Sequence, residues 1–190
     1  MAPRLTLICH APVAVPRAAG FPLDEPADPV ALAEVPKLAR GLGRFARLWT
    51  APELRARQTA DTLGSGATVV PDLRDCNYGS WRGRSLVDIN RNDPEGASSW
   101  LADAGAAPHG GESIVDLLHR VGSWLSDIQD ADHTIAVTHP AVIRAAIVHI
   151  LGAPAEAFWR IDIEPLAVTD LRRNARRWTL RSVGRTMCLV

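Results

Sequence analysis

The sequence predicts an α/β fold built around a mostly parallel β-sheet. Two short apolar runs, at residues 5–8 and 135–137, are each followed within two positions by a histidine and then by alanine or proline. Apolar runs of this length, bounded by turn signals, are typical of buried parallel strands. Segments with helical periodicity lie between the strand-like runs, as in α/β proteins. Because ligands bind beyond the carboxyl ends of parallel strands, we expect His10 and His139 to face one another across a site.

The composition places the chain among ordinary globular proteins. Its 190 residues fit one domain, which we expect to span residues 1–190, and 47% of them are apolar with a formal net charge of zero. A neutral balance gives no reason to expect nucleic acid or an anionic membrane as a partner. The three scattered cysteines argue against a disulfide framework, and no apolar run is long enough for a membrane span or a signal sequence. We therefore expect a cytoplasmic protein.

The first part of the chain predicts a strand, a loop, a helix and a second strand. Residues 12–29 are rich in proline, alanine and acids and show no period, which is typical of a long functional loop. Apolar residues recur at helical spacing over residues 31–42, and glycines mark the end of that helix. Residues 47–50 form the second predicted strand.

A helix is expected to follow this strand directly. Thr50 and Glu53 fit the spacing of a capping box, with a proline in the first turn, and Gly64 marks the end of the helix. Arg55 would then lie near a helix N-terminus at the end of a strand, where backbone N–H groups favour an anion.

The remaining elements continue the alternation of strands and helices. Glycines make residues 73–83 irregular, and a turn at residues 108–113 leads into a strongly amphipathic helix with apolar residues from Ile114 to Ile128. The other predicted elements are a short strand at residues 67–70, a short helix within residues 84–100 broken at residues 93–94, a strand at residues 134–138, a helix at residues 140–151 and two final strands at residues 167–171 and 178–183.

Polar side chains from separate elements are expected to meet at one edge of this sheet. They are His10, Arg55, Asp75 and His139. Cationic and neutral nitrogens beside helix N-termini suit a phosphate group. A neutral imidazole can attack phosphorus, a second imidazole and an arginine can neutralise charge on the phosphoryl oxygens, and a carboxylic acid can protonate the departing alkoxide. The spacing of histidines and cysteines matches no zinc pattern, so no metal site is expected.

These residues lie in motifs that resemble the histidine phosphatase superfamily, which includes the cofactor-dependent phosphoglycerate mutases. The family's Arg-His-Gly, Ser-Pro-x-x-Arg-Ala-x-Gln-Thr-Ala, Leu-x-Glu-x-x-x-Gly-x-Trp-x-Gly, Gly-Gly-Glu-Ser and Ser-His-Gly motifs correspond in order to residues 9–11, 51–60, 73–83, 110–113 and 138–140. The resemblance covers most of the chain. It implies a three-layer α/β/α fold of the phosphoglycerate mutase-like kind, and phosphoryl chemistry on a small phosphorylated substrate that needs no metal or bound cofactor.

The resemblance also implies roles for the matched residues. His10 resembles the phosphorylated nucleophile, and Arg55 resembles a phosphate clamp. His139 resembles the second histidine that contacts the phosphoryl group. Asp75 resembles the general acid.

Three departures from the family motifs affect these roles. Cys9 stands where the family has its first phosphate-binding arginine, which removes a fixed charge and a bidentate donor from that phosphate-binding position. Asp75 is one methylene shorter than the family's glutamate. Ala11 and Pro140 replace glycines that allow close backbone approach, and proline also lacks an N–H donor.

Other residues are candidates for the missing groups. Arg17, in the loop after the first strand, could bring a guanidinium to the phosphate site. Glu112 is an alternative acid, although a glutamate in the first turn of a helix also complements the helix dipole. His109, which precedes the glycine pair, either lines the mouth of the pocket or is simply exposed.

Two functions from different classes remain open. One is hydrolysis of a small phosphomonoester through a phosphohistidine at His10. The other is a weakened or inactive family member that keeps the pocket and binds a phosphorylated ligand or partner, which the changes at Cys9, Ala11 and Pro140 favour. A dinucleotide-binding oxidoreductase is disfavoured because residues 9–12 lack the glycines that admit a pyrophosphate. The resemblance makes a homodimer reasonable.

Overall fold

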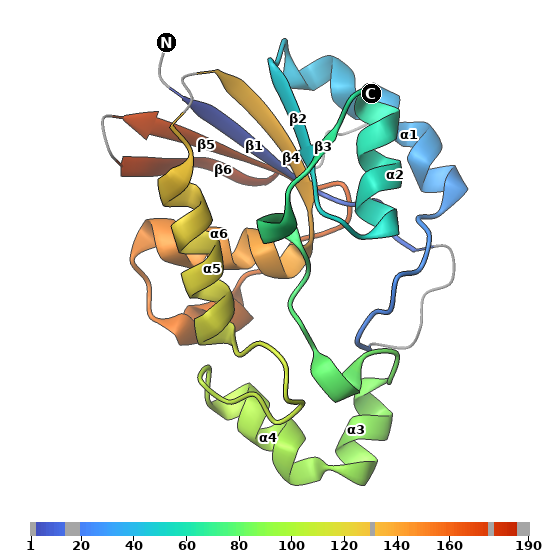
Figure 1. Ribbon diagram of the computed structural model, residues 1–190, viewed down its shortest axis with the longest axis vertical. Coiled ribbons are helices and arrows are strands. Elements are labelled where there is room, and N and C mark those ends of the chain that lie inside the picture. The colour runs from blue at the N-terminus through green and yellow to red at the C-terminus, as the bar shows by residue number, and fades with distance from the viewer. Residues whose placement is uncertain (1–2, 14–19, 130–131, 175–176, 186–190) are drawn as a thin grey trace.

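The centre of the protein is a six-stranded β-sheet with the strand order β3-β2-β4-β1-β5-β6 (Figure 1). The computed structural model describes residues 3–13, 20–129, 132–174 and 177–185. The strands are β1 (Arg4–Cys9), β2 (Arg47–Thr50), β3 (Thr68–Val69), β4 (His133–Thr138), β5 (Val168–Asn174) and β6 (Arg177–Arg185). Strands β1 to β4 are parallel, whereas β5 and β6 are antiparallel additions. The predicted α/β fold with a mostly parallel sheet is confirmed.

Helices cover both faces of this sheet. They are α1 (Pro29–Leu42), α2 (Leu54–Leu63), α3 (Leu86–Asn92), α4 (Pro94–Ala102), α5 (Ile114–Asp127) and α6 (Pro140–Leu151). Helix α1 packs against α2, and α5 packs against α6. The chain crosses from β1 to β2 through α1 and from β2 to β3 through α2, toward one edge of the sheet, and it returns from β3 to β4 through α5. Because such connections are right-handed, the pair of α1 and α2 lies on one face of the sheet and the pair of α5 and α6 on the other. Figure 1 shows α3 and α4 beyond the carboxyl ends of the parallel strands.

The two central strands are buried on both faces, which explains their continuous apolar runs. All residues of β1 from Leu5 to Cys9 and of β4 from Thr134 to Thr138 are buried. Each fully buried aliphatic side chain contributes roughly 1.5–3 kcal/mol, so these two strands are strongly held at the centre of the sheet. No helix among the described residues is long and apolar enough to cross a membrane.

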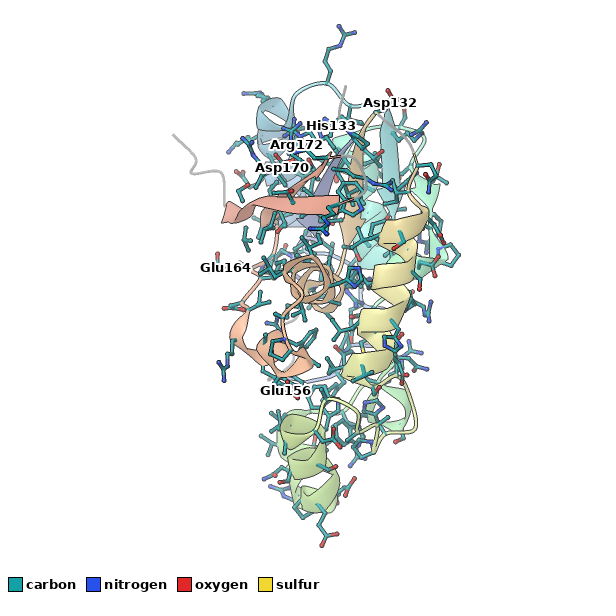
Figure 2. All side chains as sticks on the ribbon, turned by 90° about the vertical axis from the view of Figure 1, so that its left-hand side faces the viewer. Asp132, His133, Glu156, Glu164, Asp170 and Arg172 are labelled. Atoms are coloured by element: carbon teal, nitrogen blue, oxygen red, sulfur yellow. The ribbon has the colours of Figure 1, made fainter. Side chains whose placement is uncertain are left out.

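A polar network marks the end of the sheet where the parallel strands begin. Arg4 Nε donates to Asp170 Oδ1 over 2.9 Å, and Arg172 Nη2 lies 3.3 Å from Asp170 Oδ2. Figure 2 shows Asp170 and Arg172 near His133 and Asp132 at the same end of the molecule. The predicted catalytic histidines leave the sheet at its other end, so this network is separate from them.

The start of α2 differs from the prediction. Thr50 is the last residue of β2, and its hydroxyl donates to the carbonyl of Ala51 instead of capping the helix. Asp24, from the loop after β1, accepts a hydrogen bond of 2.7 Å from the backbone N–H of Leu54. Glu53 occupies the N-cap position but makes no side-chain cap hydrogen bond. The predicted capping box is wrong, because a side chain distant in sequence satisfies the first turn.

The other helix boundaries follow local capping chemistry. Asp28 caps α1, which therefore begins slightly before the predicted start at residue 31. Asp93 ends α3 and caps α4, which confirms the predicted break between them. Ser113 and Asp116 form a capping box at the start of α5. Gly152, with a φ of 59°, ends α6 in a left-handed conformation that glycine adopts without strain.

Candidate active site

Two histidines follow adjacent strands at the carboxyl end of the sheet. Cys9 of β1 pairs with Thr138 of β4, so His10 and His139 leave the sheet side by side. Their ring centroids lie 5.0 Å apart, and the ring planes meet at 62°. Parallel pairing of β1 with β4 therefore brings together two side chains that are far apart in sequence.

The hydrogen bonds of His10 define its tautomer. Nδ1 lies 2.7 Å from the carbonyl oxygen of Ala11, which can only accept, so Nδ1 carries the proton. Nε2 then holds the lone pair, and Arg55 Nε donates to it over 3.1 Å. Burial, assisted by the nearby His139 and Arg55, lowers the pKa of His10 from 6.5 to about 3. His10 is therefore a neutral imidazole at neutral pH.

Arg55 contacts His10, Asp75 and His139. It lies in the first turn of α2, and its side chain is only 2% exposed. Nη1 donates to the Leu23 carbonyl at 3.2 Å, and Nη2 donates to Asp75 Oδ2 at 2.8 Å. The same Nη2 lies 3.2 Å from His139 Nδ1. One buried guanidinium thus joins the loop after β1, the residues that follow β3 and the histidine after β4.

Asp75 is held in place by contacts on both sides. Thr138 Oγ1 donates to the Leu73 carbonyl at 2.7 Å, which fastens the segment containing Asp75 to the end of β4. Asp75 Oδ1 accepts from the backbone N–H of Cys76 at 2.9 Å, and Oδ2 lies 3.4 Å from His139 Nδ1. The carboxylate is therefore oriented toward both the arginine and the second histidine.

Glu53 belongs to the cluster although the sequence did not reveal it. Oε2 lies 2.7 Å from His139 Nε2, and Oε1 accepts from the backbone N–H of Asp75 at 3.1 Å. Burial opposes the ionisation of Glu53, but the hydrogen bond and the charge interaction with His139 prevail and lower its pKa to about 2. In the sequence, only its position two residues before Arg55 could have indicated that Glu53 belongs to the site, and a role in capping the helix explained that position equally well.

Part of the cluster opens onto a cavity of about 400 Å³, and the buried His139 is not among the residues that line it. His10, Arg55 and Asp75 line this cavity, together with Arg144 of α6. Aromatic, proline and other apolar side chains form most of the remaining wall. The volume is within the range of small-molecule sites in proteins, and the polar groups converge on one part of the wall, as they do in such sites.

The sequence matches a family model over nearly its whole length. Residues 5–186 match the histidine phosphatase superfamily (branch 1). The protein belongs to the histidine phosphatase superfamily. The family resemblance drawn from the motifs is therefore confirmed.

Known relatives of this superfamily member include phosphatases of several kinds. Adenosylcobalamin/alpha-ribazole phosphatase of Escherichia coli (strain K12) is 29% identical over 135 residues, which cover 67% of this chain and 66% of that protein, just under two thirds. Glucosyl-3-phosphoglycerate phosphatase of Mycolicibacterium vanbaalenii is 31% identical over 155 residues, covering 65% of this chain and 69% of that protein. The structure of phosphoserine phosphatase from Entamoeba histolytica, in complex with 3-phosphoglyceric acid, is similar with a TM-score of 0.85 at 18% identity. That alignment covers 97% of this chain and 98% of the other, and it shows the shared fold.

Glu112 of this histidine phosphatase superfamily member is engaged away from the histidine pair. Its carboxylate accepts hydrogen bonds of 2.8 Å from both Nε and Nη2 of Arg120. Both side chains are 8% exposed, and neither is among the residues that line the His10 cavity. The Glu112 carboxylate thus has a structural partner of its own, whereas the Asp75 carboxylate lines the cavity together with His10.

The glycine motif around Glu112 serves close backbone packing. A Cβ atom at Gly79 would collide with the His109 carbonyl oxygen, and one at Gly111 would collide with the Asn77 carbonyl oxygen. The backbone N–H of Glu112 donates to that same Asn77 carbonyl at 2.7 Å. This pairing of two irregular segments places residues 77–79 against residues 109–112.

His109 is buried by this packing. It is 3% exposed, and its ring centroid lies 5.0 Å from that of Trp81 and 6.2 Å from that of Tyr78. Burial lowers the pKa of His109. The alternative that His109 is simply exposed is wrong, because aromatic rings enclose it, and it is not among the residues that line the cavity.

Cys9 and Arg17 were the other candidates for binding the phosphate group. Cys9 is fully buried at the end of β1 and is not among the residues lining the cavity. Burial, followed by the charge of Asp75, raises the pKa of the Cys9 thiol to about 12, so the thiol is neutral. Arg17 lies outside the described residues. Arg144, which the sequence analysis did not single out, is the second guanidinium lining the cavity in the described part of the chain.

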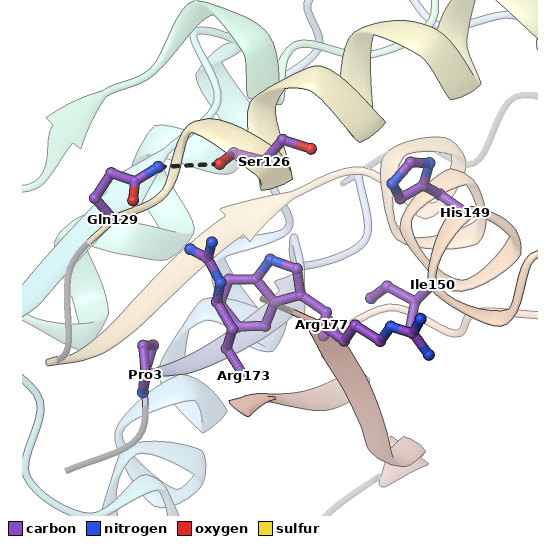
Figure 3. Close-up of a pocket in the computed structure, with 8 residues that line it drawn as sticks. Pro3, Ser126, Gln129, His149, Ile150, Arg173 and Arg177 are labelled. Carbon is purple, nitrogen blue, oxygen red and sulfur yellow. Dashed lines mark hydrogen bonds between the residues drawn. The ribbon is translucent and has the colours of Figure 1, made fainter. Parts of the chain in front are cut away.

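A second depression lies away from the histidine pair. It has a volume of about 800 Å³, and Figure 3 shows its lining residues, among them Ser126, His149, Arg173 and Arg177. None of the predicted site residues lines it.

No group of three or more His, Cys, Asp or Glu side chains that could hold a metal ion occurs in the part of the chain that the structure describes.

Proposed function

We propose that this protein hydrolyses a small phosphomonoester through a phosphohistidine intermediate at His10, without a metal ion. The observation that carries the proposal is the neutral His10 ring, whose unprotonated Nε2 lies beside Arg55 at the edge of a cavity. Membership of the superfamily and the phosphatases among the relatives support the reaction class.

Substrate binding begins at Arg55. Its Nη2 donates to Asp75 Oδ2 at 2.8 Å in the free protein. A phosphate oxygen that accepts from this guanidinium replaces the Asp75 carboxylate as partner, which leaves Asp75 available to hold a proton. Arg55 and His139 then neutralise the charge on the phosphoryl oxygens in the transition state.

The first half of the reaction transfers the phosphoryl group to His10. The lone pair of Nε2 attacks phosphorus, and the bond between phosphorus and the alcohol oxygen breaks. Asp75, which takes up a proton from solvent once the phosphate has replaced it at Arg55, donates this proton to the departing oxygen, so the product is a neutral alcohol. The Glu53 carboxylate accepts a hydrogen bond from His139 Nε2 and thereby keeps the ring oriented toward the transferred group.

The second half of the reaction releases phosphate. A water molecule enters after the alcohol leaves, and the Asp75 carboxylate accepts one of its protons as the water oxygen attacks phosphorus. The bond between phosphorus and His10 Nε2 breaks, and inorganic phosphate departs. His10 is again a neutral imidazole. Once phosphate has left, Asp75 releases its proton to solvent and pairs with Arg55 again, so the cycle is closed.

Release of p-nitrophenol from p-nitrophenyl phosphate, in the presence of EDTA, tests this function. We expect turnover by the wild-type protein that is lost in His10→Ala, and a phosphorylated chain that acid quenching and mass spectrometry detect in the wild type alone. One charged contact to a transition state contributes roughly a hundredfold in rate. The Cys9→Arg variant therefore tests whether the missing charge at position 9 limits turnover. Equal turnover by wild type and His10→Ala would contradict the mechanism.

A binding role is the competing outcome of the same experiment. The neutral, buried thiol of Cys9 is the observation that favours it, because that residue supplies no charge for a phosphate. Retained binding of inorganic phosphate, with no turnover in either wild type or Cys9→Arg, would establish a protein that binds phosphorylated ligands without hydrolysing them.

A further inference from the structure

Aromatic side chains dominate the wall of the His10 cavity. They come from the loop after β1, from the segment after β3, from α4 and from the 3-10 helix at residues 155–160, and they are Phe21, Tyr78, Trp100, Phe158 and Trp159. Proline side chains at positions 12, 22, 140 and 165 line the same cavity. The wall therefore offers broad apolar surfaces and few hydrogen-bonding groups.

These rings support one another in fixed orientations. The ring centroids of Trp100 and Trp159 lie 4.5 Å apart and those of Phe21 and Tyr78 lie 4.8 Å apart. Phe158 and Trp159 are in contact at 5.1 Å. Edge-to-face and tilted arrangements at these distances are favourable for aromatic pairs, and interlocked rings lose little freedom when a ligand binds. The wall is thus preorganised for a flat apolar group.

The charges of the wall do not favour a second anionic group on the ligand. Glu25 and Arg144 are the acidic and basic side chains that line the cavity apart from the His10 cluster, among the described residues, and their charges are opposite. Arg144 also lies 3.3 Å from Asp162, and its guanidinium stacks over Phe158 with 5.7 Å to the ring centroid. An additional carboxylate or phosphate on the substrate would therefore meet no excess of positive charge here.

We propose that the substrate of this site is a phosphomonoester whose alcohol carries a flat, mainly apolar ring and no second anionic group. This inference rests on the proposed phosphatase function. A short polar alcohol would place its hydroxyl or charged groups against ring faces and proline side chains, which offer few hydrogen-bonding atoms, whereas a ring-bearing alcohol buries apolar surface and stacks on the wall. Trp159 is the specificity-determining residue that we single out, because it lines the cavity and remains partly exposed.

A series of alkyl phosphates tests the inference with leaving groups of similar acidity. The kcat/KM values of 2-phenylethyl phosphate, ethyl phosphate and O-phosphoserine are compared in the wild-type protein. We expect 2-phenylethyl phosphate to be preferred over both others by roughly tenfold or more, as aromatic stacking together with burial of the ring predicts. Equal or higher kcat/KM values for ethyl phosphate or O-phosphoserine would overturn the inference and leave the phosphatase function standing.

Substitutions of matched residues test the part played by the wall. Trp159→Ala is expected to reduce the ratio of kcat/KM for 2-phenylethyl phosphate over ethyl phosphate by about fivefold or more, while Trp159→Phe retains most of it. Trp49→Ala is the control, since Trp49 packs against Trp124 and does not line the cavity. A ratio that stays unchanged in a folded Trp159→Ala protein would show that the wall does not select the alcohol.

Binding measurements separate a failure of this inference from a failure of the proposed function. If no ester shows hydrolysis that depends on His10, the proposed function fails. Calorimetry with 2-phenylethylphosphonate and ethylphosphonate then decides the inference by itself. Tighter binding of the ring-bearing phosphonate, by roughly tenfold, supports it, and equal affinities overturn it.

Discussion

Glu53 and His139 are joined by a hydrogen bond of 2.7 Å between Oε2 and Nε2. His139 is fully buried, and its other ring nitrogen lies 3.2 Å from Arg55 Nη2. The second oxygen of Glu53 accepts from the backbone of Asp75. One carboxylate therefore sets the orientation of both the second histidine and the acidic segment, although it does not line the cavity with His10.

Glu53→Gln is expected to lower kcat by on the order of tenfold or more, because the neutral amide orients the His139 ring less well and stabilises less positive charge on it. Stopped-flow or steady-state hydrolysis of p-nitrophenyl phosphate measures the change. Glu34→Gln is the matched control, since Glu34 lies on the surface of α1 and pairs with Lys37. A kcat for Glu53→Gln equal to that of the control would show that the contact with His139 has no catalytic role.

Arg55→Lys is expected to reduce kcat/KM by roughly a hundredfold, the effect of removing one directed hydrogen-bond donor from the transition state. Lysine keeps the charge but cannot reproduce the fork that contacts His10, the Leu23 carbonyl and Asp75 together. Kinetics with p-nitrophenyl phosphate and thermal unfolding of the same sample separate lost activity from lost structure. Near-normal kcat/KM in the lysine variant would mean that charge alone suffices.

Asp75→Asn is expected to lower the activity of the protein, whereas Glu112→Gln is expected to lower its stability. The first should lower the hydrolysis of an alkyl phosphate by about a hundredfold and of p-nitrophenyl phosphate by less, because nitrophenolate leaves without a proton. The second should leave kcat near the wild-type value and reduce the free energy of unfolding by about 1–3 kcal/mol, since it weakens the buried contact with Arg120. Urea unfolding and kcat for both esters are the measurements. The reverse pattern would make Glu112 the acid.

The free energy of unfolding is expected to decrease as the pH is lowered. The pKa of His10 is about 3 in the folded protein against 6.5 for an ordinary histidine, and that of Glu53 is about 2 against 4.5. Both groups bind protons more readily in the unfolded chain, so stability falls below pH 6.5 through His10 and below pH 4.5 through Glu53.

Urea unfolding of the wild type and of His10→Gln, at about pH 7 and about pH 5, measures the first of these contributions. The variant should lose less stability over this interval, because glutamine does not titrate. His109 and His133, whose pKa values are also lowered, contribute in the same direction and are present in both proteins. An identical loss in the two proteins would mean that His10 titrates normally when folded.

Local sequence signals predicted most of the helices and strands, and the boundaries that were predicted wrongly have physical causes. Gly152, Asp93 and the capping box at Ser113 act within one turn of the chain, so their effects could be predicted from neighbouring residues. The start of α2 could not, because Asp24 reaches the helix from a distant loop. Because Asp24 takes the place of Glu53 at the helix terminus, the Glu53 carboxylate can contact His139. No pattern of neighbouring residues predicts this contact.

The aromatic wall illustrates the same limit. In the sequence the tryptophans are scattered, and their spacing suggests no common role. The fold brings Trp100, Trp159 and Phe21 together in the cavity wall, with Trp81 packed against Phe21 and Trp100. Their neighbours are decided by how α4 and the segment before β5 pack over the carboxyl end of the sheet, which depends on contacts between residues far apart in the chain.

The sequence by itself determined the α/β class, the family and the meeting of His10, Arg55, Asp75 and His139, because strand patterns and ordered motifs are local and the parallel strands end at the same edge of the sheet. Tertiary structure decided the tautomer and depressed pKa of His10, the pairing of Glu53 with His139 and the engagement of Glu112 by Arg120. Those properties arise from burial and from hydrogen bonds between segments distant in the chain, and both exist only once the sheet and its surrounding loops have packed.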